Sequence, residues 1–111
     1  MMNHIITVGL FDQDSHKQER EKSYYIETVI DAINRYRFCA TLETEGIYGV
    51  YQHKDGTRIV EPSIRFQVAG VKRAEILELV KELRALLNQE SVMLESEEKN
   101  ITFVDAEYKD E

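Results

Sequence analysis

The stretch SIRFQVAG, residues 63–70, runs directly into VKRAEILELVKELRALL, residues 71–87, and the two halves carry different periodicities. In the first half apolar and polar residues alternate, which predicts a strand with one buried face. In the second half apolar residues recur at helical spacing among strong helix formers, which predicts a helix over 74–87. A helix with one apolar stripe needs a partner, so the two halves together predict a helix packed on a sheet.

The residues before this stretch predict a β-hairpin. A β-rich segment extends over 38–51, with Gly46 and Gly49 as bulge or bend positions, and residues 54–57 read Lys-Asp-Gly-Thr, which favours a tight turn. The strand over 63–68 follows this turn. Pro62 lacks an N–H for the sheet, so we expect an irregular entry into that strand.

The N-terminal part repeats the strand-then-helix order. Residues 5–10 alternate as a strand does, and the Ser15-x-x-Gln18 pattern has the form of a capping box, which predicts a helix over 17–36. At the other end, Val92 and Leu94 predict a fourth strand and residues 101–104 a short fifth one.

The element order is therefore β-α-β-β-α-β, with both helices on one face of the sheet. This order predicts an α+β sandwich of the ferredoxin-like class. We expect residues 1–105 to form one domain and residues 106–111 to form an acidic C-terminal tail.

Charge and cysteine content exclude several kinds of site. The net charge is −7, which argues against direct binding of nucleic acid. The single cysteine, Cys39, rules out an intramolecular disulfide, and with no basic segment before a long apolar run the chain is expected to be soluble and cytoplasmic. No Gly-rich phosphate loop or complete metal-ligand pattern is present, so neither a cofactor nor a metal is expected.

Three short motifs carry a resemblance to a known family. They are Asp55-Gly56, Glu61-Pro62-Ser63 and residues 89–92, which read Gln-Glu-Ser-Val. In these motifs the chain resembles a family of small, uncharacterised bacterial proteins. The resemblance implies the ferredoxin-like fold and no catalytic residue.

Polar residues from three separate loops are expected to meet at one end of the sheet. In this fold the end of the first strand lies beside the starts of the third and fourth strands. The candidate binding residues are Asp12, Asp14, His16, Glu61, Ser63, Gln89, Glu90 and Ser91. The alternative is that these residues cap helices and close turns for local backbone reasons.

The sheet face away from the helices is the second candidate surface. It mixes apolar and charged groups, as an interface does, and Glu43 with Arg65 could instead be a simple cross-strand ion pair on a wet face. The candidate interface residues are Ile5, Thr7, Thr41, Glu43, Arg65, Gln67 and Met93.

These surfaces favour a non-enzymatic interaction or regulatory module, with a homodimer and a protein partner expected and no membrane contact. Within this interpretation an acidic protein could inhibit a nucleic-acid-binding enzyme. The alternative is a small-molecule sensor or enzyme that uses the polar loops at one end of the sheet.

Overall fold

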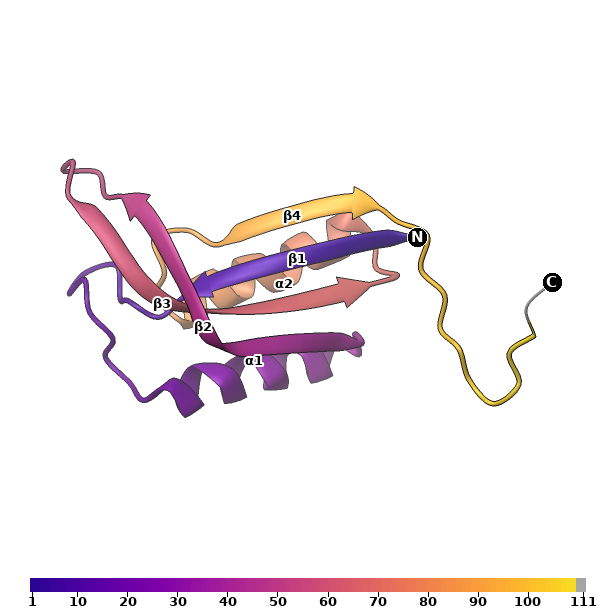
Figure 1. Ribbon diagram of the computed structural model, residues 1–111. Coiled ribbons are helices and arrows are strands. Elements are labelled where there is room, and N and C mark those ends of the chain that lie inside the picture. Colours follow the sequence, from indigo (N-terminus) through magenta and orange to yellow (C-terminus); the bar gives the residue numbers. More distant parts are fainter. Residues whose placement is uncertain (110–111) are drawn as a thin grey trace.

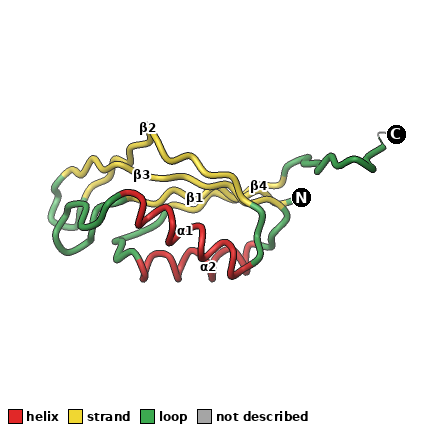
Figure 2. The backbone as a smooth tube through the Cα atoms, turned by 90° about the horizontal axis from the view of Figure 1, so that it is seen from below, coloured by secondary structure: helices red, strands yellow, loops and turns green. Residues whose placement is uncertain are grey.

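The computed structural model describes residues 1–109, and within them the chain folds as the predicted ferredoxin-like sandwich (Figure 1). The elements are β1 (Met2–Gly9), α1 (Lys22–Tyr36), β2 (Ala40–Gln52), β3 (Arg58–Ala69), α2 (Arg73–Leu86) and β4 (Met93–Glu98). The strands are antiparallel and lie in the order β2-β3-β1-β4. Both helices cover the same face of the sheet, as Figure 2 shows.

The core lies between this face and the helices. Strands β1 and β3 supply Ile6, Val8, Ile64, Phe66 and Val68, all at most 1% exposed. The buried positions of the helices are Tyr25, Val29, Ala32 and Ile33 in α1 and Ile76, Leu79, Val80 and Leu83 in α2. Burying each large apolar side chain contributes about 1.5–3 kcal/mol, so this layer is the main source of stability.

Helix α1 begins five residues later than the capping box predicts. Asp12 Oδ1 accepts the N–H groups of Asp14 and Ser15, at 2.8 and 3.2 Å, and His16 has a positive φ of 61°. This side-chain turn competes with a helix for the same backbone groups. The predicted capping box is therefore wrong, and Glu21 precedes the helix without a side-chain cap.

The β2–β3 hairpin confirms the predicted turn and one of the two predicted bulges. Gly56 has φ of 90° in the turn, and Gly46 has φ of 72° where the register shifts between Glu43 and Ile47. Gly49 is in regular pairing opposite Glu61, so the bulge expected there is wrong. Figure 1 shows this hairpin extending past the end of β1.

Pro62 lies inside β3, opposite Tyr48, and the irregular entry expected there is also wrong. Its carbonyl accepts the N–H of Leu10, at 3.0 Å, on the side of β3 where β1 has just ended at Gly9. A strand residue directs its N–H and C=O to the same side. The missing N–H of Pro62 would therefore point past the end of β1, where no ladder bond is required.

The predicted fifth strand over 101–104 does not form in the described part of the chain. Residues 99–109 leave the sheet as an irregular segment, although Phe103 lines a shallow cavity with Cys39 and Gln67. Part of the predicted acidic tail, residues 110–111, lies outside the described residues. No helix among residues 1–109 is long and apolar enough to cross a membrane.

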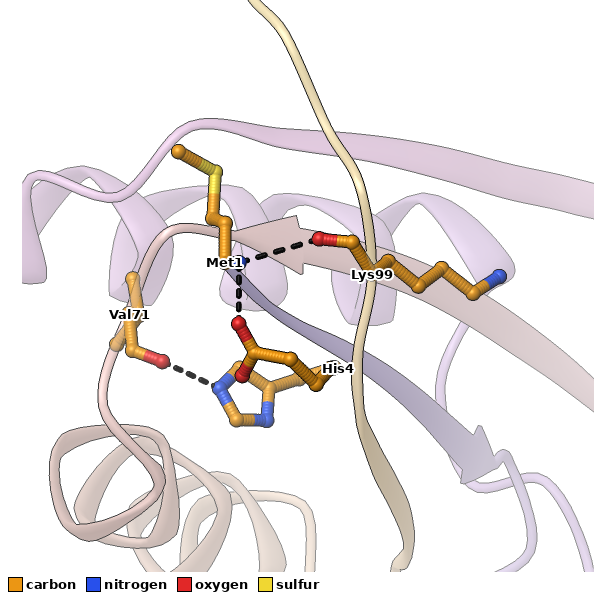
Figure 3. Close-up of polar contacts among 5 residues, drawn as sticks. Met1, His4, Val71 and Lys99 are labelled. Atoms are coloured by element: carbon orange, nitrogen blue, oxygen red, sulfur yellow. Dashed lines mark hydrogen bonds and ion pairs between the residues drawn. The ribbon is translucent and has the colours of Figure 1, made fainter.

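His4 connects the edge strand β4 to the chain entering α2. Figure 3 shows its Nε2 bonded to the carbonyl of Val71, while its Nδ1 contacts Ser96 Oγ at 2.8 Å. The ring is fully buried, although His4 lies near the start of the first strand. Beside it, the amino group of Met1 pairs with Glu98 and donates to the carbonyl of Lys99 (Figure 3).

Replacing His4 by leucine should therefore destabilise the fold. The carbonyl of Val71 and the hydroxyl of Ser96 would both lose a buried partner, so we expect a loss of about 2–4 kcal/mol. Urea unfolding followed by circular dichroism measures it. Ser96→Ala, which removes one of the two His4 contacts together with the exposed bond from Arg73 Nη1, should cost about 1 kcal/mol. A His4→Leu protein as stable as the original would show that this network contributes nothing.

Candidate functional site

A cavity of about 170 Å³ opens on the sheet face that the helices leave uncovered, at the end where β1 stops. Its walls come from all four strands and from the loop before β4. The residues that line it are Thr7, Gly9, Gly49, Val50, Tyr51, Glu61, Ser63, Ser91 and Met93. It therefore gathers candidate binding residues from two of the three predicted polar segments, namely Glu61, Ser63 and Ser91, with two of the candidate interface residues, Thr7 and Met93.

Glu61 is the most unusual residue in this cavity, because a carboxylate is only 6% exposed there. Burial raises its pKa above the ordinary glutamate value, the N–H of Phe11 lowers it, and the charge of Glu90 raises it further. The Phe11 N–H donates to Glu61 Oε2 at 2.9 Å. A desolvated carboxylate held by one backbone donor is typical of binding and catalytic sites.

Two glycines make room for this carboxylate. A Cβ atom added to Gly9 would lie 2.0 Å from Glu61 Oε1, closer than any real contact allows. A Cβ atom added to Gly49 would lie 3.1 Å from Ser63 Oγ. Because Gly9 and Gly49 have no side chains, they leave space for Glu61 and Ser63 in the cavity.

The cavity also contains a hydroxyl without a partner. Thr7 Oγ1 is shielded from solvent and forms no hydrogen bond with the described residues. Ser63 differs, because its Oγ donates to the carbonyl of Glu61 at 3.3 Å. A buried polar atom with no partner costs stability, and such atoms are often retained where a ligand satisfies them.

Aromatic and histidine side chains stand at the hairpin side of the site. Burial raises the pKa of Tyr51, and the charges of Glu61 and Glu90 raise it further. His53 Nδ1 lies 3.0 Å from Glu90 Oε1, and its ring contacts that of His16 edge-on, with centroids 4.1 Å apart. His53 thereby joins the hairpin to the loops after β1 and α2.

The loop after β1, which carries Asp12 and Asp14, is held in place by Asn88. Asn88 Nδ2 donates to Asp12 Oδ2 at 2.8 Å and to Asp14 Oδ2 at 3.0 Å, which ties the loop after β1 to the end of α2. Hydrogen bonds from Asn88 and from the backbone of Asp14 and Ser15 lower the pKa of Asp12. Both oxygens of Asp12 and Oδ2 of Asp14 thus have local partners, as the local alternative expects, and a binding role for these two residues stays a prediction.

Apart from Asp12 and Asp14, the candidate binding residues fall into three groups. Glu61, Ser63 and Ser91 line the cavity. Glu90 and His16 stand beside it through His53, and Gln89 is buried beneath it.

The candidate interface residues do share one face, as the strand registers show. Thr7 and Met93 line the cavity itself. Arg65 Nη1 lies 4.0 Å from Glu43 Oε1, which is the predicted cross-strand pair at the limit of an ion pair. Ile5, Thr41 and Gln67 lie farther along the same face, so their part in a homodimer stays a prediction.

The sequence did not lead us to predict four residues as parts of the site: Gly9, Gly49, Tyr51 and His53. A signal for two of them was present, because the turn at 54–57 sets the hairpin register. That register pairs Tyr51 with Ile59 and Gly49 with Glu61, and paired residues share a face. Described residues offer no cluster of three or more His, Cys, Asp or Glu side chains suited to a metal ion.

No protein-family model and no curated protein matches this chain. Among solved structures, the chain is similar to a phage SAM lyase in complex with S-methyl-5′-thioadenosine, with a TM-score of 0.66 and 22% identity. It is also similar to a phage SAM lyase in the apo state, with a TM-score of 0.59 and 21% identity. Each match covers 98% of this chain and 92% of the other.

At this identity the likeness shows the fold, over almost the entire chain. It nevertheless corrects the functional interpretation, because these structural neighbours are enzymes that act on a small molecule. The prediction of a non-enzymatic interaction or regulatory module, including the acidic inhibitor, is therefore wrong, and so is the inclination against an enzyme. The open face of this sheet carries a recessed, desolvated carboxylate, which a flat contact surface does not need, and the comparison favours the small-molecule alternative.

Proposed function

We propose that this chain binds S-adenosylmethionine in the cavity around Glu61 and cleaves it to release S-methyl-5′-thioadenosine. The observation that carries the proposal is the buried carboxylate of Glu61, on a fold shared with a phage SAM lyase over 98% of the chain. A cytoplasmic location stays part of this proposal.

Electrostatics favours this substrate over its product. S-adenosylmethionine carries a sulfonium and an ammonium group, whereas the thioether product is uncharged. Glu61 in the cavity and Glu90 beside it place negative charge where these cations would lie. Attraction between opposite charges is stronger in a partly desolvated site than in water, so substrate binds and the neutral product leaves.

Cleavage requires no external nucleophile. The carboxylate of the substrate attacks its own γ-carbon, the C–S bond breaks, and the bonding electron pair stays on sulfur. The products are S-methyl-5′-thioadenosine and a four-carbon lactone that keeps the ammonium group. This step cancels a negative and a positive charge, so exclusion of water by the cavity lowers its barrier.

The cavity residues would hold the substrate for this ring closure. Glu61 would bind the ammonium or sulfonium group, and the hydroxyls of Thr7, Ser63 and Ser91 offer hydrogen bonds for the polar groups of the substrate. A volume of about 170 Å³ is below the usual size of a complete ligand pocket. It therefore fits the reacting amino-acid end, with the nucleoside lying over the open sheet face.

The proposal is tested by incubating the protein with S-adenosylmethionine and measuring S-methyl-5′-thioadenosine and lactone by chromatography. Glu61→Gln should lower turnover about 100-fold or more, the usual effect of removing a charge that stabilises the reacting state. Because burial raises the Glu61 pKa in the fold, an ionised Glu61 opposes folding as pH rises. Glu61→Gln should therefore be at least as stable as the original at neutral pH.

The same pKa predicts the pH dependence of binding. As pH falls through the raised pKa of Glu61, protonation removes its charge, so affinity for the sulfonium substrate should drop while affinity for the neutral product stays level. Glu43→Gln, on the same face outside the cavity, serves as the control. Absence of product formation by the folded protein, or full activity of Glu61→Gln, would contradict the proposal.

Thr7→Val tests the unpartnered hydroxyl. Valine keeps the shape and removes a buried polar atom without a partner, so stability should rise by about 1 kcal/mol. Affinity for S-adenosylmethionine should fall about fivefold if the ligand uses this hydroxyl. Thermal unfolding and calorimetric titration measure the two effects. Unchanged affinity would remove Thr7 from the site.

Gly9→Ala tests the room that the cavity floor leaves for Glu61. The added methyl group must displace the carboxylate or the backbone, so we expect a loss of about 1–3 kcal/mol and weaker substrate binding. Gly49→Ala, whose methyl group would lie 3.1 Å from Ser63 Oγ and 3.8 Å from Glu61 Cγ, should cost less. In a Glu61→Ala background the cost of Gly9→Ala should vanish; if it persists, the two positions are not coupled.

A further inference from the structure

Gln89 is a buried polar residue at the loop after α2, and it does not line the cavity. It is only 2% exposed. Its Nε2 donates to the carbonyl of Phe11 at 2.9 Å and to that of Leu87 at 3.4 Å. A buried side-chain amide costs desolvation unless it is bonded, so these contacts fix its orientation.

Phe11 is the residue that connects Gln89 to the site. Its carbonyl accepts from Gln89, and its N–H donates to Glu61 Oε2 at 2.9 Å. Phe11 follows the end of β1, so the strand ladder does not hold these groups. Gln89, Phe11 and Glu61 therefore form one hydrogen-bonded series that joins the loop after α2 to the cavity.

The rest of this loop is held by other contacts. Gln13 N–H donates to the carbonyl of Asn88 at 2.9 Å, and Gln13 Nε2 donates to Asn88 Oδ1 at 2.6 Å. Asp12 adds its bond from Asn88 Nδ2. These contacts hold the loop after β1 against the end of α2 and do not involve Gln89. The bond from Gln89 to the Phe11 carbonyl is therefore not needed to hold this loop.

The role of the bond from Gln89 is to direct the Phe11 N–H. On its other side the Glu61 carboxylate lies against Gly9, which has no side chain to contact it. The Phe11 N–H is the donor that opposes the effects of burial and of Glu90 on this carboxylate. If Phe11 turns, Glu61 loses both its orientation and its only backbone donor among the recorded hydrogen bonds of residues 1–109.

We propose that Gln89 is a positioning residue: by holding the carbonyl of Phe11, it aims the Phe11 N–H at Glu61 and so fixes the carboxylate that faces the cavity. This inference rests on the proposed function for the part that concerns catalysis. The hydrogen-bonded series itself is independent of which ligand the cavity takes.

The test compares Gln89→Met with Gln13→Met. Methionine nearly matches glutamine in size and removes the amide in both variants, but only Gln89 contacts Phe11. Titration of the Glu61 side-chain carboxyl, followed by carbon-13 NMR, should show a higher midpoint in Gln89→Met and an unchanged midpoint in Gln13→Met. Affinity for S-adenosylmethionine should fall about tenfold in Gln89→Met alone, the equivalent of about one hydrogen bond to a charged group.

A second measurement needs no substitution at Gln89 and applies even if Gln89→Met fails to fold. In the original protein, the side-chain NH₂ resonances of Gln89 should shift with pH at the Glu61 midpoint, because protonation of Glu61 weakens its bond to the Phe11 N–H and lets the Phe11 backbone, which Gln89 also contacts, change position. The Gln13 resonances should not follow that midpoint. In Glu61→Gln the response of Gln89 should disappear.

The outcomes separate this inference from the proposed function. A Glu61 midpoint unchanged in Gln89→Met, or Gln89 resonances that ignore the Glu61 midpoint, would overturn the positioning role whatever the cavity binds. If neither S-adenosylmethionine nor S-methyl-5′-thioadenosine binds the original protein, the proposed function fails. The two NMR results would still decide whether Gln89 positions Glu61.

Discussion

The central position of β1 is the constraint on which the rest of the structure depends. This strand pairs with β3 on one side and β4 on the other, and its Ile6 and Val8 are fully buried under the helices. β1 stops at Gly9, while β2 and β3 continue as a hairpin. Beyond Gly9 the sheet therefore lacks the strand that would pair with β3 on that side. The cavity is the direct consequence of this difference in strand length.

The cavity shows how such a fold can hold a charge at low cost. A carboxylate transferred out of water without partners is strongly unfavourable, and a full ion pair would neutralise it for binding. At Glu61 the compensation is one backbone N–H, that of Phe11, together with room made by a glycine. The charge of an ionised Glu61 is therefore only partly compensated by the protein, and a site for a cationic ligand requires such a charge.

Local patterns predicted much of the fold and less of the site. The alternation over 63–68 and the helical spacing after it were sufficient for β3 and α2, because those periodicities reflect which side of one element is buried. The start of α1 was missed because the side chain of Asp12 takes the backbone groups of Asp14 and Ser15, and sequence spacing cannot weigh a turn against a helix. The burial of Glu61 depends on where β1 ends, which local patterns do not show. Glu61 was therefore predicted as a candidate binding residue, but its low exposure was not predicted.

The close approach of Glu61 to Gly9 also constrains which residues can occupy these two positions together. A side chain at position 9 and a glutamate at position 61 would occupy the same space, so a substitution at one position depends on the residue at the other. A larger residue at position 9 fits this space only if the carboxylate at 61 shifts or is replaced by a shorter side chain. The two positions, fifty-two residues apart in the chain, are therefore expected to vary together among relatives of this protein.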